Sequence, residues 1–259
     1  MSLFDRATCG VEARLVANPR CRRFLAVSSI TKEKFIGEYG VEEARVLVLP
    51  PGTDVSRFSG IDRERNRAAI RRSLGIDDST PILLFVSMNF EVKGLDYVMR
   101  GLAELKRRQP PAMPVLYVVG RGNEGHYRRM AEELGSTGTP ASRGHGPGEA
   151  RRDLQGSDFF AMLSRFDTFG MAALDAMAAS LPVVLSGNVG AKDLVRDGVN
   201  GFVAGDPADA KAVAERFVRL LDPEIRRRMG QEAFRTAGGQ SWDEIARRQI
   251  EIYEGLLAI

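Results

Sequence analysis

Strands and helices alternate along this chain of 259 residues, and the alternation predicts an α/β fold with a doubly wound parallel sheet. Two observations support this class. The runs at 82–87 and 115–119 are apolar at nearly every position, which is typical of strands buried on both faces of a sheet. The segment after 94 instead places its apolar residues on one helical face, at Leu95, Val98, Met99, Leu102 and Leu105.

Short apolar runs mark the remaining strands. We predict strands at 24–27, 46–49, 82–87, 115–119, 158–163 and 181–185. Helices are predicted between them, at 31–38, from Gly94 onward, around 127–134 and at 171–179. Connections between parallel strands are expected to be right-handed, so the domain should be Rossmann-like, with helices on both faces.

The last part of the chain is predicted to be helical. Asp206 and Asp222 each precede a proline, a pattern typical of an N-cap followed by the first helical residue. Ser241 and Glu244 form a capping box for a final helix. The segment 135–148 is the exception, because its five glycines and two prolines predict a loop. We expect the strand of the alternation to be short or absent there, with a mobile loop nearby.

Composition excludes several classes of protein. A 44% hydrophobic and 27% charged chain is globular, and its apolar runs are too short to span a bilayer. No signal-like segment opens the chain, so we expect a cytoplasmic location. Cys9 and Cys21 form no CxxC pair, which favours reduced thiols and no metal site. Since 37 basic residues face 34 acidic ones in scattered helical clusters, we expect no nucleic-acid partner, although anionic lipid headgroups stay candidates.

Two candidate sites follow predicted strands, where open parallel sheets bind ligands. Lys93 and Gly94 stand at a helix start after 82–87, in a loop that includes Asn89. Helix-end amides and an ammonium suit a phosphate, whereas the alternative is an exposed loop lysine. Gly120 and Arg121 follow 115–119, where glycine allows close approach of a ligand; the alternative is an ordinary turn.

A third candidate site leads from a strand end into the helix 171–179. The amides from Gly170 onward should be unpaired helix N-terminal donors, which suit an anion. Asp167 lies in the preceding loop, and Asp175 lies in an otherwise apolar helix. A buried carboxylate needs a partner, and a ribose or sugar diol would donate two hydrogen bonds to it. The alternative is that Asp175 faces solvent.

At these residues the chain resembles a known family. The pattern from Asp167 through Gly170, Asp175 and the Asp197-Gly198-Val199-Asn200-Gly201 turn is similar to retaining GT-B glycosyltransferases of group 1, family 4. Pro50-Pro51-Gly52-Thr53-Asp54 resembles the interdomain element of that family. Within the family, the residues of this element and of the loop that carries Lys93 look closest to the lipopolysaccharide core glucosyltransferase branch. The fold would then be the C-terminal half of a GT-B fold, usually metal-independent.

The resemblance implies roles for matched positions. Lys93 would hold the pyrophosphate of a nucleotide-sugar donor, with a UDP-sugar expected and no further cofactor. The donor site would be made by Asn89, Lys93, Gly94, Gly120, Arg121, Asp167, Phe169, Gly170, Met171 and Asp175. Asp167 would contact sugar hydroxyls, Asp175 the ribose diol, and Arg143 and His145 would lie near the base. No catalytic residue is identified.

Departures from the family pattern frame the alternatives. Asp167 and Asp175 stand where the family has glutamates, each one methylene longer. Residues 1–49 resemble only the last strand–helix–strand part of an acceptor domain, and residues 50–259 the nucleotide-sugar-binding domain. We therefore expect a fragment of a larger enzyme or a shortened paralogue. Its exposed apolar edge would favour pairing with a second copy, as a homodimer, or packing on its own donor domain.

The leading hypothesis is a hexosyltransferase that moves a hexose from a nucleotide sugar to a glycan or lipid-linked acceptor with retention, at the inner face of the cell membrane. The alternative of a different class is a non-catalytic nucleotide-sugar-binding or scaffold fragment. A nucleotide-sugar epimerase is another reading. A phosphorylase would need a pyridoxal-binding lysine in a much longer chain.

Overall fold

A five-stranded, wholly parallel sheet forms the centre of the molecule. The computed structural model describes residues 3–58, 62–135 and 147–258. The strands lie in the order β4-β3-β5-β6-β7, which confirms the predicted α/β class with a parallel sheet. Their bounds are β3 Ile82–Ser87, β4 Val115–Gly120, β5 Phe159–Met162, β6 Val183–Ser186 and β7 Gly201–Ala204.

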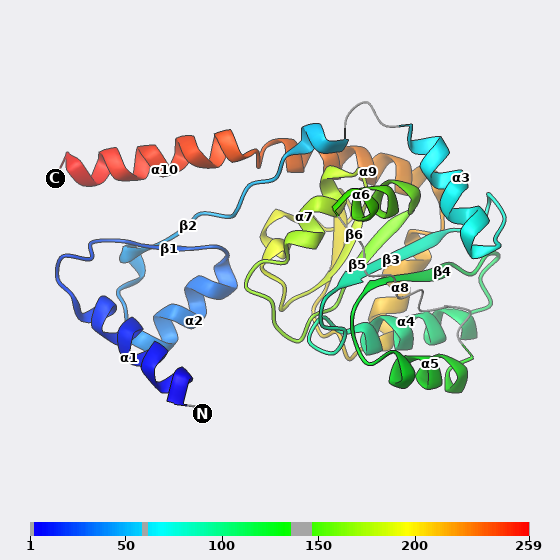
Figure 1. Cartoon of the computed structure of the whole chain (residues 1–259), viewed down its shortest axis with the longest axis horizontal. Helices are drawn as coiled ribbons and strands as arrows, with labels where there is room; N and C mark the ends of the chain where they lie inside the picture. Colours follow the sequence, from blue (N-terminus) through cyan, green and yellow to red (C-terminus); the bar gives the residue numbers. More distant parts are fainter. Residues whose placement is uncertain (1–2, 59–61, 136–146, 259) are drawn as a thin grey trace.

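Helices cover both faces of this sheet (Figure 1). One apolar cluster joins the sheet to α4, α5 and α8, which are Leu95–Arg107, Glu124–Glu133 and Ala210–Arg219. The other joins it to α3, α6, α7 and α9, which are Arg63–Leu74, Pro147–Gly156, Met171–Ala178 and Pro223–Gly238. Successive residues of one strand belong to opposite clusters, as Leu83 and Leu84 do, because side chains alternate across a sheet. The strands are apolar on both sides for this reason.

A smaller parallel sheet precedes the large one. β1 (Phe24–Ala26) pairs with β2 (Val46–Val48), and α2 (Ser29–Tyr39) connects them. α1 spans Leu3–Ala17, and short 3₁₀ turns occupy Glu43–Arg45, Val55–Phe58 and Gly190–Leu194. Leu25 and Val48 are each more than a third exposed, so the small sheet presents apolar side chains to solvent.

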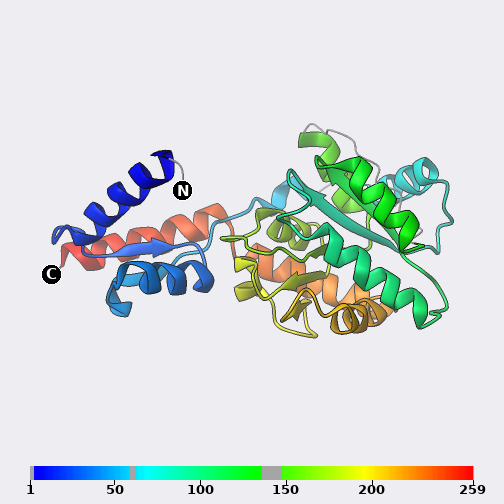
Figure 2. The same cartoon turned by 90° about the horizontal axis from the view of Figure 1, so that it is seen from below.

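Two chain segments cross between the two sheets. The first runs through Gly52 and Thr53, and the second leads into α10 (Trp242–Leu257), which extends back toward the small sheet (Figures 1 and 2). The Thr53 amide donates to the Gln240 carbonyl at 2.8 Å. Gly52 lies so close to Trp242 that a Cβ added there would be 2.8 Å from its backbone. None of the helices in the described part of the chain has the length and apolarity needed to cross a lipid bilayer.

The structure corrects several expectations. Asp206 does not cap a helix; Asp209 caps α8, because it accepts from the amides of Lys211 and Ala212. Asp222 caps α9 as predicted, and Ser241 caps α10. The elements that sequence reasoning missed are α1, α3, α6 and β7, none of which carries a long apolar run. Most of the segment 135–148 lies outside the described residues, and the described part of it shows no strand.

Candidate functional site

A pocket of about 690 Å³ opens at the carboxyl ends of β3, β4 and β5. It brings together residues from all three predicted sites. Of the predicted donor-site residues, its walls include Lys93, Gly120, Arg121, Asp167, Phe169, Gly170 and Met171. Asn89, Gly94 and Asp175 lie outside this lining, and Arg143 and His145 lie outside the described residues.

A buried aromatic side chain, Phe90, fixes the loop that carries Lys93 to the core of the domain. Phe90 is almost fully buried and packs edge-on against Phe85 and Tyr127, with centroid distances of 6.0 and 5.8 Å. Gly94 ends the loop with φ +74°, and an added Cβ would lie 2.0 Å from the Leu163 carbonyl oxygen. This conformation and this space require glycine, which sets the start of α4 directly after Lys93.

Lys93 forms an ion pair with Asp167 inside the pocket. The Asp167 side chain is 10% exposed and that of Lys93 is 27% exposed. The other carboxylate oxygen of Asp167 accepts from the Phe169 amide at 3.3 Å. The pocket thus contains a partly buried ammonium whose counter-ion is the Asp167 carboxylate. A more strongly anionic ligand can compete with this carboxylate for the ammonium.

The N-terminus of α7 lies beside this ion pair. Gly170 caps the helix at φ +92° with no side-chain hydrogen bond, and an added Cβ would lie 2.8 Å from Val189 Cγ1. Among the described residues, no hydrogen bond uses the amides of Gly170, Met171 and Ala172. Free amides and the helix dipole favour an anion at this point, next to the Lys93 ammonium.

Asp175 lies one turn further along α7, behind the pocket. Its Oδ1 accepts a hydrogen bond from Thr53 Oγ1 at 3.1 Å, across 122 residues of sequence. Burial raises the pKa of the Asp175 carboxyl above its ordinary value, and the Thr53 hydrogen bond opposes that rise. The carboxylate is half-buried rather than solvent-facing, with one neutral partner.

Contacts from the small sheet reach the loop of the pocket. Ser28, which caps α2 and is fully buried, donates through Oγ to the Thr168 carbonyl at 2.6 Å. Ser29 donates to Asp193 through both its amide and its hydroxyl, each at 2.6 Å. Sequence reasoning missed Ser28 and Ser29. The only signal was a serine pair before a predicted helix, which indicates a cap but no distant partner.

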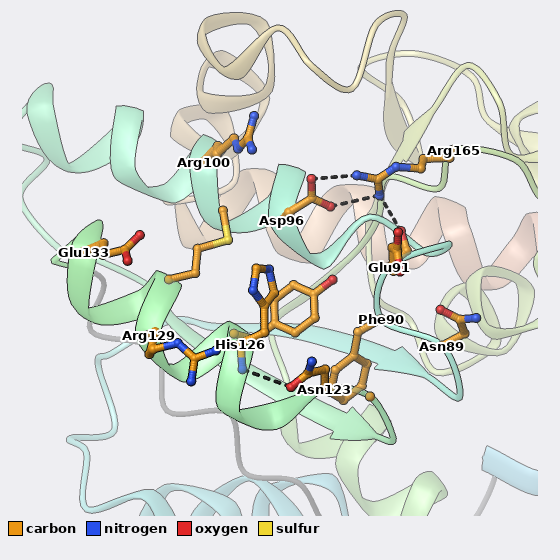
Figure 3. Close-up of a pocket in the computed structure, with 13 residues that line it drawn as sticks. Asn89, Phe90, Glu91, Asp96, Arg100, Asn123, His126, Arg129, Glu133 and Arg165 are labelled. Atoms are coloured by element: carbon orange, nitrogen blue, oxygen red, sulfur yellow. Dashed lines mark hydrogen bonds and ion pairs between the residues drawn. The ribbon is translucent and has the colours of Figure 1, made fainter.

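A second pocket of about 670 Å³ lies on the other side of Phe90, between α4 and α5 (Figure 3). Asn89 and His126 line it. Arg165 donates to both oxygens of Asp96, at 3.0 and 2.9 Å, and also to the Glu91 carbonyl. The bidentate pair ties the loop after β5 to the first turn of α4, and the Glu91 contact ties it to the loop after β3. Within the described ranges, no three His, Cys, Asp or Glu side chains cluster in a way that would hold a metal ion.

Comparison with known proteins identifies the family. Residues 66–236 match the model of the family described as glycosyl transferases group 1. The chain belongs to this family. Two D-inositol 3-phosphate glycosyltransferases, from Nocardia farcinica and Actinosynnema mirum, are 31% and 32% identical over 242 and 244 residues. These alignments cover 91% and 89% of this chain but 53% and 57% of the relatives, so the chain spans about half their length.

Solved glycosyltransferase structures share the fold. The chain matches WaaG, a glycosyltransferase involved in lipopolysaccharide biosynthesis, with TM-score 0.78 and 22% identity, over 97% of this chain and 68% of WaaG. It matches Anabaena HepE in complex with UDP and glucose with TM-score 0.73 and 20% identity, over 92% and 64%. The group 1 chain is therefore α/β with a parallel sheet and corresponds to half of a GT-B fold, as predicted.

Proposed function

We propose that this group 1 glycosyltransferase chain binds a nucleotide-sugar donor through its diphosphate. The observation that carries the proposal is the Lys93–Asp167 ion pair in a large pocket at the free N-terminus of α7. A diphosphate would take the Lys93 ammonium from Asp167 and accept from the amides that follow Phe169. The same groups would stabilise the charge that develops on the departing nucleoside diphosphate.

Asp167, once released from Lys93, would be free to accept hydrogen bonds from the donor sugar. For Asp175 we propose a different role, in which it accepts from a ribose diol, and its single neutral hydrogen-bond partner supports this because acceptor positions are left over. For the whole protein we propose transfer of a hexose with retention, and UDP as the first nucleotide to test. The HepE complex with UDP and glucose supports this choice.

The acceptor is proposed from two sources. The relatives' names point to an inositol phosphate, and the resemblance to lipopolysaccharide core glucosyltransferases points to a glycan or lipid-linked acceptor at the membrane surface. Assays of acceptor-dependent product with inositol 3-phosphate and with a lipid-linked glycan separate these two. The candidate of another class is a non-catalytic subunit that binds the nucleotide sugar, and the shortened Asp167 and Asp175 side chains favour it.

Calorimetric titration with UDP, GDP, ADP and their common sugars tests the donor site. We expect Lys93→Ala to weaken binding by about tenfold or more, as loss of a charge-assisted contact should. Lys211→Ala, which removes an exposed lysine on α8, is the matched control and should bind normally. Failure of every nucleotide to bind a folded sample would refute the proposal.

A double variant tests the mechanism of that loss. Lys93→Ala alone leaves the Asp167 carboxylate uncompensated, and that charge would repel an anion by itself. Lys93→Ala/Asp167→Asn removes the repulsion without restoring a cation. We expect the double variant to recover only part of the lost affinity, because no cation has been restored. Full recovery would mean that Lys93 only neutralises Asp167 and does not contact the diphosphate.

A further inference from the structure

A second cationic cavity lies at the opposite edge of the large sheet. Its volume is about 360 Å³, and its walls include Arg63, Arg67, Asp158, Ser180, Arg226 and Arg227. Asp158 directly precedes β5 and Ser180 lies shortly before β6, so the cavity is at the amino ends of the strands. The pocket with Lys93 is at their carboxyl ends, and the length of the sheet separates the two.

The Asp158 carboxylate of the cavity wall already has arginine partners. Asp158 forms ion pairs with Arg67 and with the fully buried Arg71, the latter at 2.6 Å, and also accepts from the Ile82 amide at 2.8 Å. Arg227 pairs with Glu224 at 2.8 Å. Glu64 is the second carboxylate of the cavity wall, so the four arginines Arg63, Arg67, Arg226 and Arg227 outnumber its two carboxylates.

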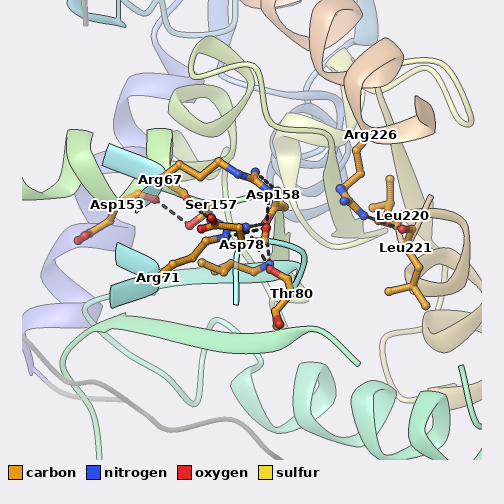
Figure 4. Close-up of polar contacts among 12 residues, drawn as sticks. Arg67, Arg71, Asp78, Thr80, Asp153, Ser157, Asp158, Leu220, Leu221 and Arg226 are labelled. Carbon is orange, nitrogen blue, oxygen red and sulfur yellow. Dashed lines mark hydrogen bonds and ion pairs between the residues drawn. The ribbon is translucent and has the colours of Figure 1, made fainter. Parts of the chain in front are cut away.

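Two arginines of the cavity wall, Arg63 and Arg226, form no ion pair in the described part of the chain. Arg226 donates to the carbonyls of Leu220 and Leu221, at 2.6 and 2.8 Å, and lies across from Arg67 and Arg71 on the other side of Asp158 (Figure 4). Those acceptors are neutral. In the described part of the chain, the Arg63 side chain forms no hydrogen bond or ion pair. Neither guanidinium is held by a carboxylate in an ion pair, although the charges of Asp158 and Glu64 act on Arg63 and those of Asp158 and Asp222 act on Arg226.

Burial acts on both of these groups. Desolvation lowers the pKa of the Arg63 and Arg226 guanidinium groups below the ordinary value, and the charge of Asp158 opposes this in each case. Guanidinium groups stay protonated at neutral pH, so the cost of removing them from water is not relieved by loss of the proton. An anion that entered the cavity would offset it.

We propose that this cavity binds a phosphate group, either free or on a small phosphorylated metabolite. Arginine presents its donors as a planar fork that matches phosphate oxygens, and here arginines converge from two separate helices, α3 and α9. The volume lies within the range of small-molecule sites. Ser180 and Gln231 also line the cavity and offer neutral hydrogen-bonding groups to the rest of such a molecule.

Calorimetry with inorganic phosphate and with glucose 6-phosphate, at constant ionic strength, tests the site. Arg63→Gln removes the unpaired guanidinium and should weaken binding by about tenfold or more. Arg65→Gln is the matched control, because Arg65 is exposed on the same helix and does not line the cavity. Thermal denaturation of both variants shows that they are folded.

Lys93→Ala separates this site from the donor pocket. Phosphate binding that survives Lys93→Ala and is lost on adding Arg63→Gln supports the proposal. Tighter binding of glucose 6-phosphate than of phosphate would assign a phosphate ester, and equal binding would assign free phosphate. Equal affinities of Arg63→Gln and Arg65→Gln would overturn the proposal, as would complete loss of binding in Lys93→Ala alone.

Discussion

Removal of the Asp158 carboxylate should destabilise the large sheet strongly. The Asp158 side chain is 4% exposed and the Arg71 side chain 1% exposed. Truncation to alanine leaves a buried guanidinium without its counter-ion and the Ile82 amide without an acceptor. Breaking a buried ion pair from one side costs about 3–5 kcal/mol, and an unpaired buried amide about 1–3 kcal/mol.

Other contacts of Arg71 reduce this sum. Its guanidinium also donates to the carbonyls of Asp78, Thr80 and Gly156, at 3.2, 3.0 and 3.1 Å, and these bonds survive the change. We therefore expect Asp158→Ala to lower the free energy of unfolding by about 4 kcal/mol. Asp158→Asn keeps one oxygen for Arg71 or the Ile82 amide but loses the charge, so about 2 kcal/mol is expected.

Urea denaturation followed by circular dichroism measures both values. The slope with urea should be the same in all three proteins, since the surface exposed on unfolding does not change. We expect the free energy of unfolding to increase from Asp158→Ala to Asp158→Asn to the unmodified chain. A loss below about 1 kcal/mol for Asp158→Ala would refute the reasoning, because solvated pairs contribute that little.

Three further perturbations are informative. Gly94→Ala should cost about 2–4 kcal/mol in thermal denaturation, because it adds a backbone clash to a left-handed φ, whereas Gly75→Ala, at φ +66° in open space, should cost only about 1 kcal/mol; equal costs would contradict this. Asp175→Asn should stabilise the protein at pH 7 and weaken nucleotide binding. Because the folded-state pKa of Asp175 is raised, the ionised carboxylate destabilises the folded protein above that pKa, and this destabilisation vanishes as the pH falls below the unfolded value of 3.8. Urea denaturation should therefore show a larger free energy of unfolding for Asp175→Asn at pH 7 and no difference at pH 3. Asp193→Ala removes both acceptors of Ser29 and should speed limited proteolysis within residues 3–49, with Asp209→Ala, a cap on α8, leaving that rate unchanged.

The sequence predicted the parts of the fold that carry a strong apolar pattern. The buried strands β3 and β4 were found almost to the residue, because nearly every position in them is apolar. α3 was missed because arginine dominates it and Ile70 is its one buried apolar residue. β7 was missed because its four residues begin with glycine, so that turn chemistry concealed a short strand.

For the site, residues directly after strands could be predicted and their distant partners could not. Lys93, Gly120 and Asp167 follow strand ends, and parallel strands bring these ends to one edge of the sheet. Thr53 and Ser28 reach the site from 122 and 140 residues away, the first from the segment between the two sheets and the second from the N-terminus of α2. Hydrophobic periodicity describes how an element faces its own core, and it holds no information on such a contact.

Because two chain segments connect the small sheet to the large one, the two parts should stay joined after one segment is cut. The segments at Gly52–Thr53 and Gln240–Trp242 run beside each other and are joined by a hydrogen bond that the Thr53 amide donates to the Gln240 carbonyl. A single protease cut in either segment would leave the other as a tether. Two parallel tethers also permit bending across the junction while they resist rotation about its long axis.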